Sequence, residues 1–207
     1  MSPKILVIVG PTASGKTRMA VELAQRHNGE VISADSMQIY RTMDIGTAKP
    51  TQEEMGGIPH HMIDVADPEE DFSVAWYVEM AARCVDDVLA RGKLPTVAGG
   101  TGLYIDSLLS GRTFAPFSPD SALRGELERE MAEKGGAAML EELSKVDPEA
   151  AARLHPNDHK RIIRALEVYR STGKTITQHN RETQAIPPRY NALTIGLAFQ
   201  DRQAMWR

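Results

Sequence analysis

Eight consecutive residues near the start of the chain match the phosphate-binding pattern G-x-x-x-x-G-K-S/T at every fixed position. In such a loop, successive backbone N–H groups form an anion nest at the positive end of the helix that follows. Lys16 would then reach the terminal phosphates, and the hydroxyl of Thr17 would be placed to ligate Mg²⁺. The predicted diphosphate- or nucleotide-binding residues are Gly10, Pro11, Thr12, Ala13, Ser14, Gly15, Lys16 and Thr17.

The residues on either side of this loop predict the elements that must position it. An apolar run over residues 5–9 predicts a buried parallel strand. After the loop, Met19, Ala20, Leu23 and Ala24 recur at helical spacing. The alternative is a glycine-rich turn that binds no phosphate, and the complete motif in this strand–loop–helix setting disfavours it.

Strands and helices alternate over the first 111 residues. Ser73 caps a predicted helix that Gly92 ends, another helix is predicted over 103–109, and 36–59 reads as a long loop of the kind that is usually functional. The further predicted strands are 30–34, 60–65 and 94–98. This alternation predicts an α/β fold, a P-loop NTPase-like doubly wound parallel sheet with right-handed connections.

The character of the sequence changes after Gly111. Residues 112–119 read as a proline-containing linker, and helices without a strand follow from about 120 to 180, one of them capped by Asn157. An apolar strand over 191–197 should then rejoin the sheet. The predicted domains are a P-loop core (1–111), a helical insertion (112–188), and a return strand with the start of a further part (189–207). Residues 201–207 would begin a helix that they cannot finish, so we expect the chain to be incomplete.

Two further features should lie beside the phosphate loop, because ligands of a doubly wound sheet bind outside the carboxyl ends of its strands. Asp35 follows the strand 30–34 and is a candidate general base. Holding Mg²⁺ through water, or capping the next segment, are the alternatives for this carboxylate. The turn from Gly99 to Gly102 allows a ligand close to the backbone and offers the Thr101 hydroxyl, although it could be only a tight connection.

A basic helix stands out in the second half of the chain. The segment 153–174 has six Lys or Arg residues against two acidic ones. Lys160 and Arg164 share one face of the predicted helix, with Arg161 beside Arg164. The face could contact nucleic acid or could simply be solvated, and the pattern alone leaves both open.

Composition limits the remaining choices. The 207 residues are 42% apolar and 25% charged, which is typical of a soluble globular protein with a real core. The net charge of −4 argues against a globally basic nucleic-acid binder, so any such contact needs a local patch. No apolar run reaches membrane-spanning length, and the first strand leaves no room for a signal peptide, so we expect a cytoplasmic protein.

Cysteine and histidine give no sign of a redox or zinc site. The single cysteine, Cys84, falls in the apolar stripe of a predicted helix, where a core position is favoured over a nucleophile. His60 and His61 begin a predicted strand without a second cluster of metal ligands, so we expect them to pack rather than to bind zinc.

Five motifs in order resemble the tRNA dimethylallyltransferase (tRNA isopentenyltransferase) family of the bacterial type. They are GPTASGKT at 10–17, ADSMQIYRTMDIGTAKP at 34–50, PHHMIDV at 59–65, GGTGLY at 99–104 and HKRIIRALEVY at 159–169. The family continues beyond the point where this chain stops.

This resemblance implies an activity and assigns roles to particular residues. The implied reaction transfers a dimethylallyl group from its diphosphate to N6 of adenosine 37, beside the anticodon of tRNA, with Mg²⁺ on Thr17. Asp35, Thr101 and Lys16 would be catalytic, in a protein expected to be a monomer. The implied tRNA contacts are Asp35, Ser36, Met37, Gln38, Thr101, Arg124, His159, Lys160, Arg161, Ile162 and Ile163.

Two other classes of protein share the phosphate loop. A small-molecule kinase using ATP would carry a compact arginine-rich lid, and none stands out here. A nucleotide-dependent switch would need an apolar strand ending in Asp, which Met62-Ile63-Asp64 matches only in part.

Overall fold

The computed structural model describes residues 4–70, 72–111 and 121–198. It divides the chain into two compact units, Met1–Arg112 with Pro187–Arg207, and Thr113–Ile186. The predicted linker at 112–119 and the predicted helix start at 201–207 lie outside the described residues. Within the described part of the chain, no helix combines the length and apolar character needed to cross a membrane.

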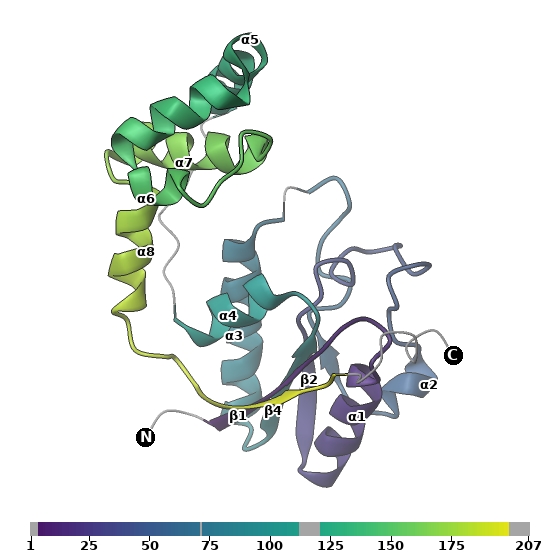
Figure 1. The fold of residues 1–207 in the computed structure, drawn as a ribbon. Coiled ribbons are helices and arrows are strands. Elements are labelled where there is room, and N and C mark those ends of the chain that lie inside the picture. Colours follow the sequence, from purple (N-terminus) through teal and green to yellow (C-terminus); the bar gives the residue numbers. More distant parts are fainter. Residues whose placement is uncertain (1–3, 71, 112–120, 199–207) are drawn as a thin grey trace. The chain divides into compact units, whose positions relative to one another are not determined.

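The first unit is built on a five-stranded, all-parallel sheet with the strand order β3-β2-β4-β1-β5 (Figure 1). Its strands are β1 (Lys4–Val9), β2 (Gly29–Ser33), β3 (His60–His61), β4 (Leu94–Gly99) and β5 (Asn191–Gly196). Its helices are α1 (Lys16–Arg26), α2 (Gln52–Met55), α3 (Val74–Ala90) and α4 (Gly102–Leu109). The predicted doubly wound α/β sheet is confirmed, including the return of the chain to the sheet as β5.

Helices cover both faces of this sheet, and the alternation of side chains along β1 explains why. Ile5 and Val7 pack into the core formed with α3 and α4, whereas Leu6 and Ile8 pack into the core formed with α1. A strand that is buried on both faces reads as a continuous apolar run. This is the pattern that predicted β1 from the sequence.

The third strand is shorter than predicted. The prediction of a strand over 60–65 was wrong beyond His61, because Met62 and Asp64 have φ values of 64° and 56°. This left-handed conformation is rare for residues with a side chain and ends an extended strand. The backbone N–H of Asp64 instead donates to the carbonyl of Gln38 at 3.2 Å. The segment after β3 therefore supports the loop that follows β2.

The second unit is helical and has its own apolar core. Its helices are α5 (Ser121–Val146), α6 (Pro148–Ala151), α7 (His159–Thr172) and α8 (Ile176–Gln184). The core side chains are Leu127, Met131, Met139, Leu143, Ala151, Ile162, Ile163, Ala165 and Leu166. Gly135, with φ 79° and ψ 161°, breaks α5 into two helical stretches that fold around this core.

The two ends of α7 differ, because the residue before the first turn makes no side-chain hydrogen bond to the helix whereas a glycine caps the last turn. Asp158 occupies the position before the first helical residue, so the prediction that Asn157 caps the helix was wrong by one residue. At the other end, Gly173 adopts φ 71° and its N–H donates to the carbonyl of Tyr169 at 2.8 Å. A glycine in this conformation ends a helix at little cost.

Candidate active site

The loop between β1 and α1 has the backbone shape of an anion nest. Ala13 and Gly15 adopt positive φ values of 63° and 82°, and α1 begins directly afterwards at Lys16. The carbonyl of Pro11 accepts hydrogen bonds from the Ser14 N–H at 3.3 Å and from Lys16 Nζ at 2.5 Å. The ammonium of Lys16 thus lies against its own loop, at the helix N-terminus that attracts anions.

Two glycines allow the strand ends to come together around this loop. A Cβ on Gly99 would lie 2.1 Å from the carbonyl oxygen of Ala34, and a Cβ on Gly10 would lie 2.8 Å from the carbonyl oxygen of Leu197. Neither position could hold a larger residue without moving a backbone. The glycine-rich turn after β4 therefore packs directly against the turn that carries Asp35.

A cavity of about 280 Å³ opens at the carboxyl ends of β1, β2 and β4. It is lined by Thr12, Ala13, Ser14, Gly15, Lys16, Thr17, Arg18, Asp35, Gln38, Ala48, Pro50, Glu54, Ala98 and Gly99. This volume lies just below the roughly 300 Å³ at which pockets for drug-sized molecules start, so it suits a small ligand group. The structure thus brings the predicted phosphate loop and Asp35 to one cavity.

Lys16 and Asp35 both line this cavity and interact electrostatically. Partial burial lowers the pKa of the Lys16 ammonium, and the nearby carboxylate of Asp35 raises that pKa in opposition. In a partly enclosed site, such a cation can stabilise a negatively charged leaving group, and the carboxylate beside it can accept a proton.

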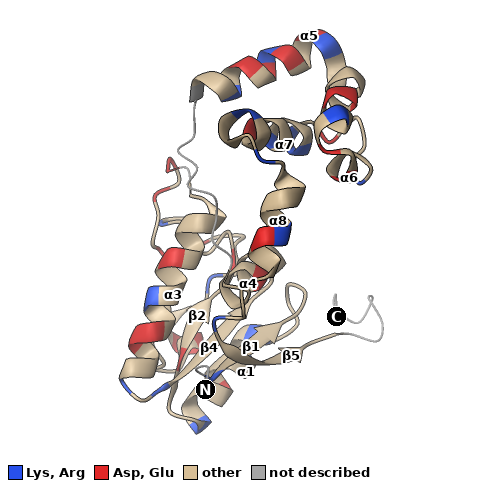
Figure 2. Ribbon diagram, turned by 90° about the vertical axis from the view of Figure 1, so that its left-hand side faces the viewer, with Lys and Arg blue, Asp and Glu red and all other residues tan. Residues whose placement is uncertain are grey.

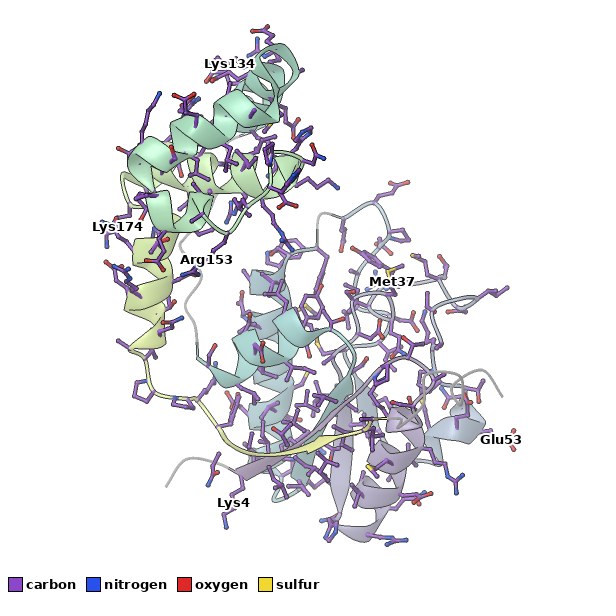
Figure 3. All side chains as sticks on the ribbon, in the orientation of Figure 1. Lys4, Met37, Glu53, Lys134, Arg153 and Lys174 are labelled. Atoms are coloured by element: carbon purple, nitrogen blue, oxygen red, sulfur yellow. The ribbon has the colours of Figure 1, made fainter. Side chains whose placement is uncertain are left out.

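The turn that carries Asp35 is fixed by two hydrogen bonds. Asp35 Oδ1 accepts from the Met37 N–H at 2.9 Å, and Thr101 Oγ1 accepts from the Ser36 N–H at 3.0 Å. Neither bond uses Asp35 Oδ2, so the carboxylate retains acceptor capacity. Met37 on this turn is 44% exposed (Figure 3).

The loop after this turn is held by two buried polar side chains. Gln38 Oε1 accepts from Ser33 Oγ at 2.9 Å, and Gln38 Nε2 donates to the Ala48 carbonyl at 2.9 Å. Lys49, whose side chain is only 8% exposed, donates through Nζ to Asp44 and Asp64, each at 2.6 Å. The predicted functional loop is therefore ordered although it has almost no regular secondary structure.

The loop fits the predicted magnesium ion through oxygen ligands. The Thr17 hydroxyl lines the cavity, and the buried hydroxyl of Ser14 has no hydrogen-bond partner among the described residues. Mg²⁺ is bound through one or two protein oxygens together with phosphate oxygens and water, rather than by a closed cage of side chains. In the described part of the chain, no group of three or more His, Cys, Asp or Glu side chains could form such a cage.

The remaining predicted tRNA contacts lie in the helical unit. His159, Lys160 and Arg161 are exposed on the first turn of α7, which Figure 2 shows carrying basic residues. Ile162 and Ile163, from the same predicted segment, are buried in the helical core at 0% and 5% exposure. Their side chains pack the core, so we assign them no direct contact with a ligand.

The predictions for histidine and cysteine concern positions away from the cavity. His60 Nδ1 lies 2.8 Å from the Ile58 carbonyl, and His61 Nε2 lies 2.7 Å from Glu30 Oε2. Cys84, on α3, is partly buried against the apolar core of the first unit, where burial raises the pKa of its thiol. A thiol with a raised pKa is a poor nucleophile, in accord with the expected packing role.

Several functional positions were missed from the sequence. Ala48, Pro50 and Glu54 line the cavity, and Lys49 organises the loop that brings them there. The first three positions carry no motif of their own, although Ala48 and Pro50 belong to the segment 34–50 that supported the resemblance. A lone lysine in a loop gives no signal of burial.

The all-parallel sheet with this loop after its first strand defines a P-loop α/β protein. A family model described as IPP transferase matches residues 38–207, and one described as isopentenyl transferase matches residues 3–67. The chain belongs to the IPP transferase family.

Curated relatives share this assignment. The chain is 52% identical to a tRNA dimethylallyltransferase of Acetivibrio thermocellus over 98% of its own length, and 50% identical to one of Caldanaerobacter subterraneus over 100%. It spans 64% and 66% of the length of these two relatives.

Two solved structures of transferases are also similar to this chain. The tRNA isopentenylpyrophosphate transferase of Bacillus halodurans is 46% identical with a TM-score of 0.63, covering 98% of this chain and 62% of that one. A eukaryotic dimethylallyltransferase described as acting on tRNA is 33% identical with a TM-score of 0.79, covering 95% of this chain and 48% of that one.

Proposed function

We propose that the protein transfers a dimethylallyl group from dimethylallyl diphosphate to N6 of adenosine 37 beside the anticodon of tRNA and releases diphosphate. The observation that carries this proposal is that the nest, Lys16 and Asp35 line the same cavity. Membership of the IPP transferase family and the names of the relatives support the same activity.

The residues of the cavity divide the chemistry between them. The nest and Lys16 would bind the diphosphate and stabilise the negative charge that develops on it as the carbon–oxygen bond breaks. The N6 amine would form the new bond to the allylic carbon, and Asp35 would accept the proton that the amine loses. Mg²⁺, held by the Thr17 hydroxyl and diphosphate oxygens, would supply further charge neutralisation when bound.

The target base must leave its stack to reach such a cavity, as for other enzymes that modify bases. We propose that the turn over residues 35–38 and Thr101 contact the extruded nucleotide, and that Arg124 with His159, Lys160 and Arg161 contact the tRNA backbone. We also propose that the protein acts as a monomer. The exposure of the first turn of α7 supports its part in this set.

A small-molecule kinase is the second candidate, and the loop itself is the feature that favours it. A nucleotide-dependent switch is less well supported, because Asp64, its carboxylate for the metal, bonds to Lys49 and does not line the cavity. Among the described residues that line the cavity, Arg18 is the one arginine, so they form no arginine-rich lid.

The test is incubation with dimethylallyl diphosphate, Mg²⁺ and unmodified tRNA with adenosines at positions 36 and 37, followed by mass analysis of nucleosides. We expect a dimethylallyl adduct of adenosine and stoichiometric release of diphosphate. A parallel reaction with ATP and small acceptors tests the kinase. ATP consumption without an adduct on tRNA would refute the prenyl transfer.

A further inference from the structure

Glu167 is a fully buried carboxylate in the middle of the helical unit. Its side chain is 0% exposed on α7, and its atom Oε1 accepts no hydrogen bond from the described residues. A buried anion with an unused acceptor costs stability compared with an apolar side chain of similar volume. Packing of the helical core therefore gives no reason for a glutamate at this position.

Two arginines from different helices meet on the other oxygen of this carboxylate. Arg164 Nη1, three residues earlier on α7, lies 3.1 Å from Glu167 Oε2, and Arg124 Nη1, on the first turn of α5, lies 3.4 Å from the same atom. The side chains of the arginines are 41% and 37% exposed. Each guanidinium thus has one end on a buried anion while part of the side chain reaches the surface.

This arrangement removes freedom from two side chains that are otherwise very mobile. A long surface arginine loses much rotamer entropy when it binds a ligand, and ordering it beforehand removes that cost from binding. The planar guanidinium also has several donors in a fixed geometry, so an arginine held at one edge can still donate to a phosphate. Lys160 lies one helical turn before Arg164 on the same face.

We infer that Glu167 is a positioning residue that holds Arg124 and Arg164 as a fixed pair for a phosphate of the RNA backbone. The inference rests on the proposed binding of tRNA by this protein. It gives a role to an acidic side chain that is buried beneath basic surface residues, where its negative charge would otherwise oppose the binding of RNA.

The sign of one substitution separates positioning from simple electrostatics. Glu167→Gln removes a negative charge, so long-range electrostatics alone would strengthen tRNA binding. If Glu167 orders the arginines, the same change instead weakens binding by about tenfold and lowers the salt slope by about one unit, since a phosphate contact is lost. The Michaelis constant for tRNA should rise, with the turnover number and diphosphate affinity unchanged.

Glu128→Gln is the matched control. Glu128 Oε1 accepts from Arg124 Nε at 3.1 Å, but its side chain is 56% exposed. Water screens such a surface pair, so this variant loses the same charge without disordering the arginine. We expect its tRNA affinity to equal or slightly exceed that of the wild type.

A double-mutant cycle, which treats the two arginines as one site and Glu167 as the other, tests whether Glu167 acts through the arginines. Its triple variant also guards against a loss of binding that comes only from misfolding. The triple variant Arg124→Gln/Arg164→Gln/Glu167→Gln replaces the whole ionic group by neutral amides, so it leaves no buried charge unpaired. Added to the two arginine changes, Glu167→Gln should alter tRNA affinity by less than twofold. The inference is overturned if Glu167→Gln weakens tRNA binding tenfold both in the wild type and in the variant with the two arginine changes. It is also overturned if Glu167→Gln and the wild type have equal tRNA affinity and salt slope. Either result leaves the proposed function standing. A wild-type chain without measurable tRNA affinity overturns the inference and the proposed function together.

Discussion

Thr101 Oγ1 accepts a hydrogen bond from the backbone N–H of Ser36 at 3.0 Å and thereby ties the turn after β4 to the turn after β2. The N–H of Thr101 in return donates to the carbonyl of Ala34 at 3.1 Å. Asp35 lies between these two anchored residues. The Thr101 hydroxyl, predicted from the sequence as a ligand contact, therefore also supports the proposed base. Its own proton remains available for donation to a ligand.

Thr101→Val should disturb this support while keeping the shape of the side chain. The N–H of Ser36 would lose its acceptor, and the Asp35 carboxylate would no longer be held within the narrow range that catalysis needs. We expect single-turnover prenyl transfer to fall by about 10²-fold, with diphosphate affinity within twofold of the wild type. Thr101→Ser should restore most of the rate, and a fully active Thr101→Val would remove Thr101 from the site.

Asp35→Asn should remove the proposed base and leave its turn intact. The amide oxygen can still accept from the Met37 N–H, which Asp35 Oδ1 does at 2.9 Å. Loss of a general base lowers turnover by about 10²–10⁴-fold, so we expect a fall in that range with little change in donor binding. The measurement is the single-turnover rate at saturating tRNA. A near-normal rate would show that Asp35 does not take the proton.

The elements around the cavity could be predicted where one physical pattern determines them. β1 is an unbroken apolar run because both of its faces are covered, and α3 follows from Ser73, whose Oγ accepts from the Trp76 N–H at 3.3 Å. The end of β3 could not be predicted, because the apolar residues after His61 suit a strand and only the tertiary contacts impose positive φ on Met62.

Polar elements were the hardest to predict. No residue of α8 is buried, so it has no apolar stripe, and the only available signal was the capping box between Thr175 and Gln178. The buried charges Lys49 and Glu167 have no sequence signal either, because nothing in a single sequence separates a buried ion from a solvated one. These two residues organise the surfaces on which the proposed function depends.

Lys16→Ala should impair the leaving-group side of the reaction. The ammonium lies at the nest and provides the point charge that a diphosphate requires. We expect calorimetry to show diphosphate affinity reduced by at least tenfold and prenyl transfer to collapse, while tRNA binding survives. The control is Lys4→Ala, which removes the same charge at the start of β1 (Figure 3), at the opposite end of the strand from the phosphate loop. It should leave diphosphate binding intact. Equal affinity in the two variants would exclude the proposed phosphate site.

Glu30 should make the first unit sensitive to acid. This buried carboxylate lies 2.7 Å from Arg91 Nη2 and 2.7 Å from Lys93 Nζ, and these partners hold its pKa well below the usual value of 4.5. The ionised form therefore stabilises the fold at pH values above about 4.5, and this contribution declines as the pH falls further.

Glu30→Gln should lower the free energy of unfolding at pH 7 by roughly 2 kcal/mol, because it breaks a partly buried ionic cluster. The difference from the wild type should shrink between pH 4.5 and pH 3 in urea titrations followed by circular dichroism. Glu79→Gln, which removes an exposed partner of Arg83, should be close to neutral at every pH. A Glu30→Gln penalty that did not change with pH would contradict this assignment.

Lys160 and Arg161 test the basic surface of α7 directly. Both are exposed, whereas Arg164 is bound to the buried Glu167, so changing only the first two leaves the helical core undisturbed. If each contacts a tRNA phosphate, Lys160→Gln/Arg161→Gln should weaken tRNA binding and flatten its salt dependence by about one unit of slope per lost contact. The apparent Michaelis constant for tRNA should rise without a change in diphosphate affinity.

The matched control is Arg153→Gln/Arg181→Gln, which removes two positive charges elsewhere in the same unit. Arg153 and Arg181 both pair with Glu149, and their side chains are 71% and 69% exposed. Filter-binding titrations at several salt concentrations would compare both double variants with the wild type. A general loss of positive charge would weaken binding equally in the two variants, whereas specific phosphate contacts on α7 would flatten the slope only for Lys160→Gln/Arg161→Gln. If that variant kept the wild-type affinity and slope, this face of α7 would be solvated surface.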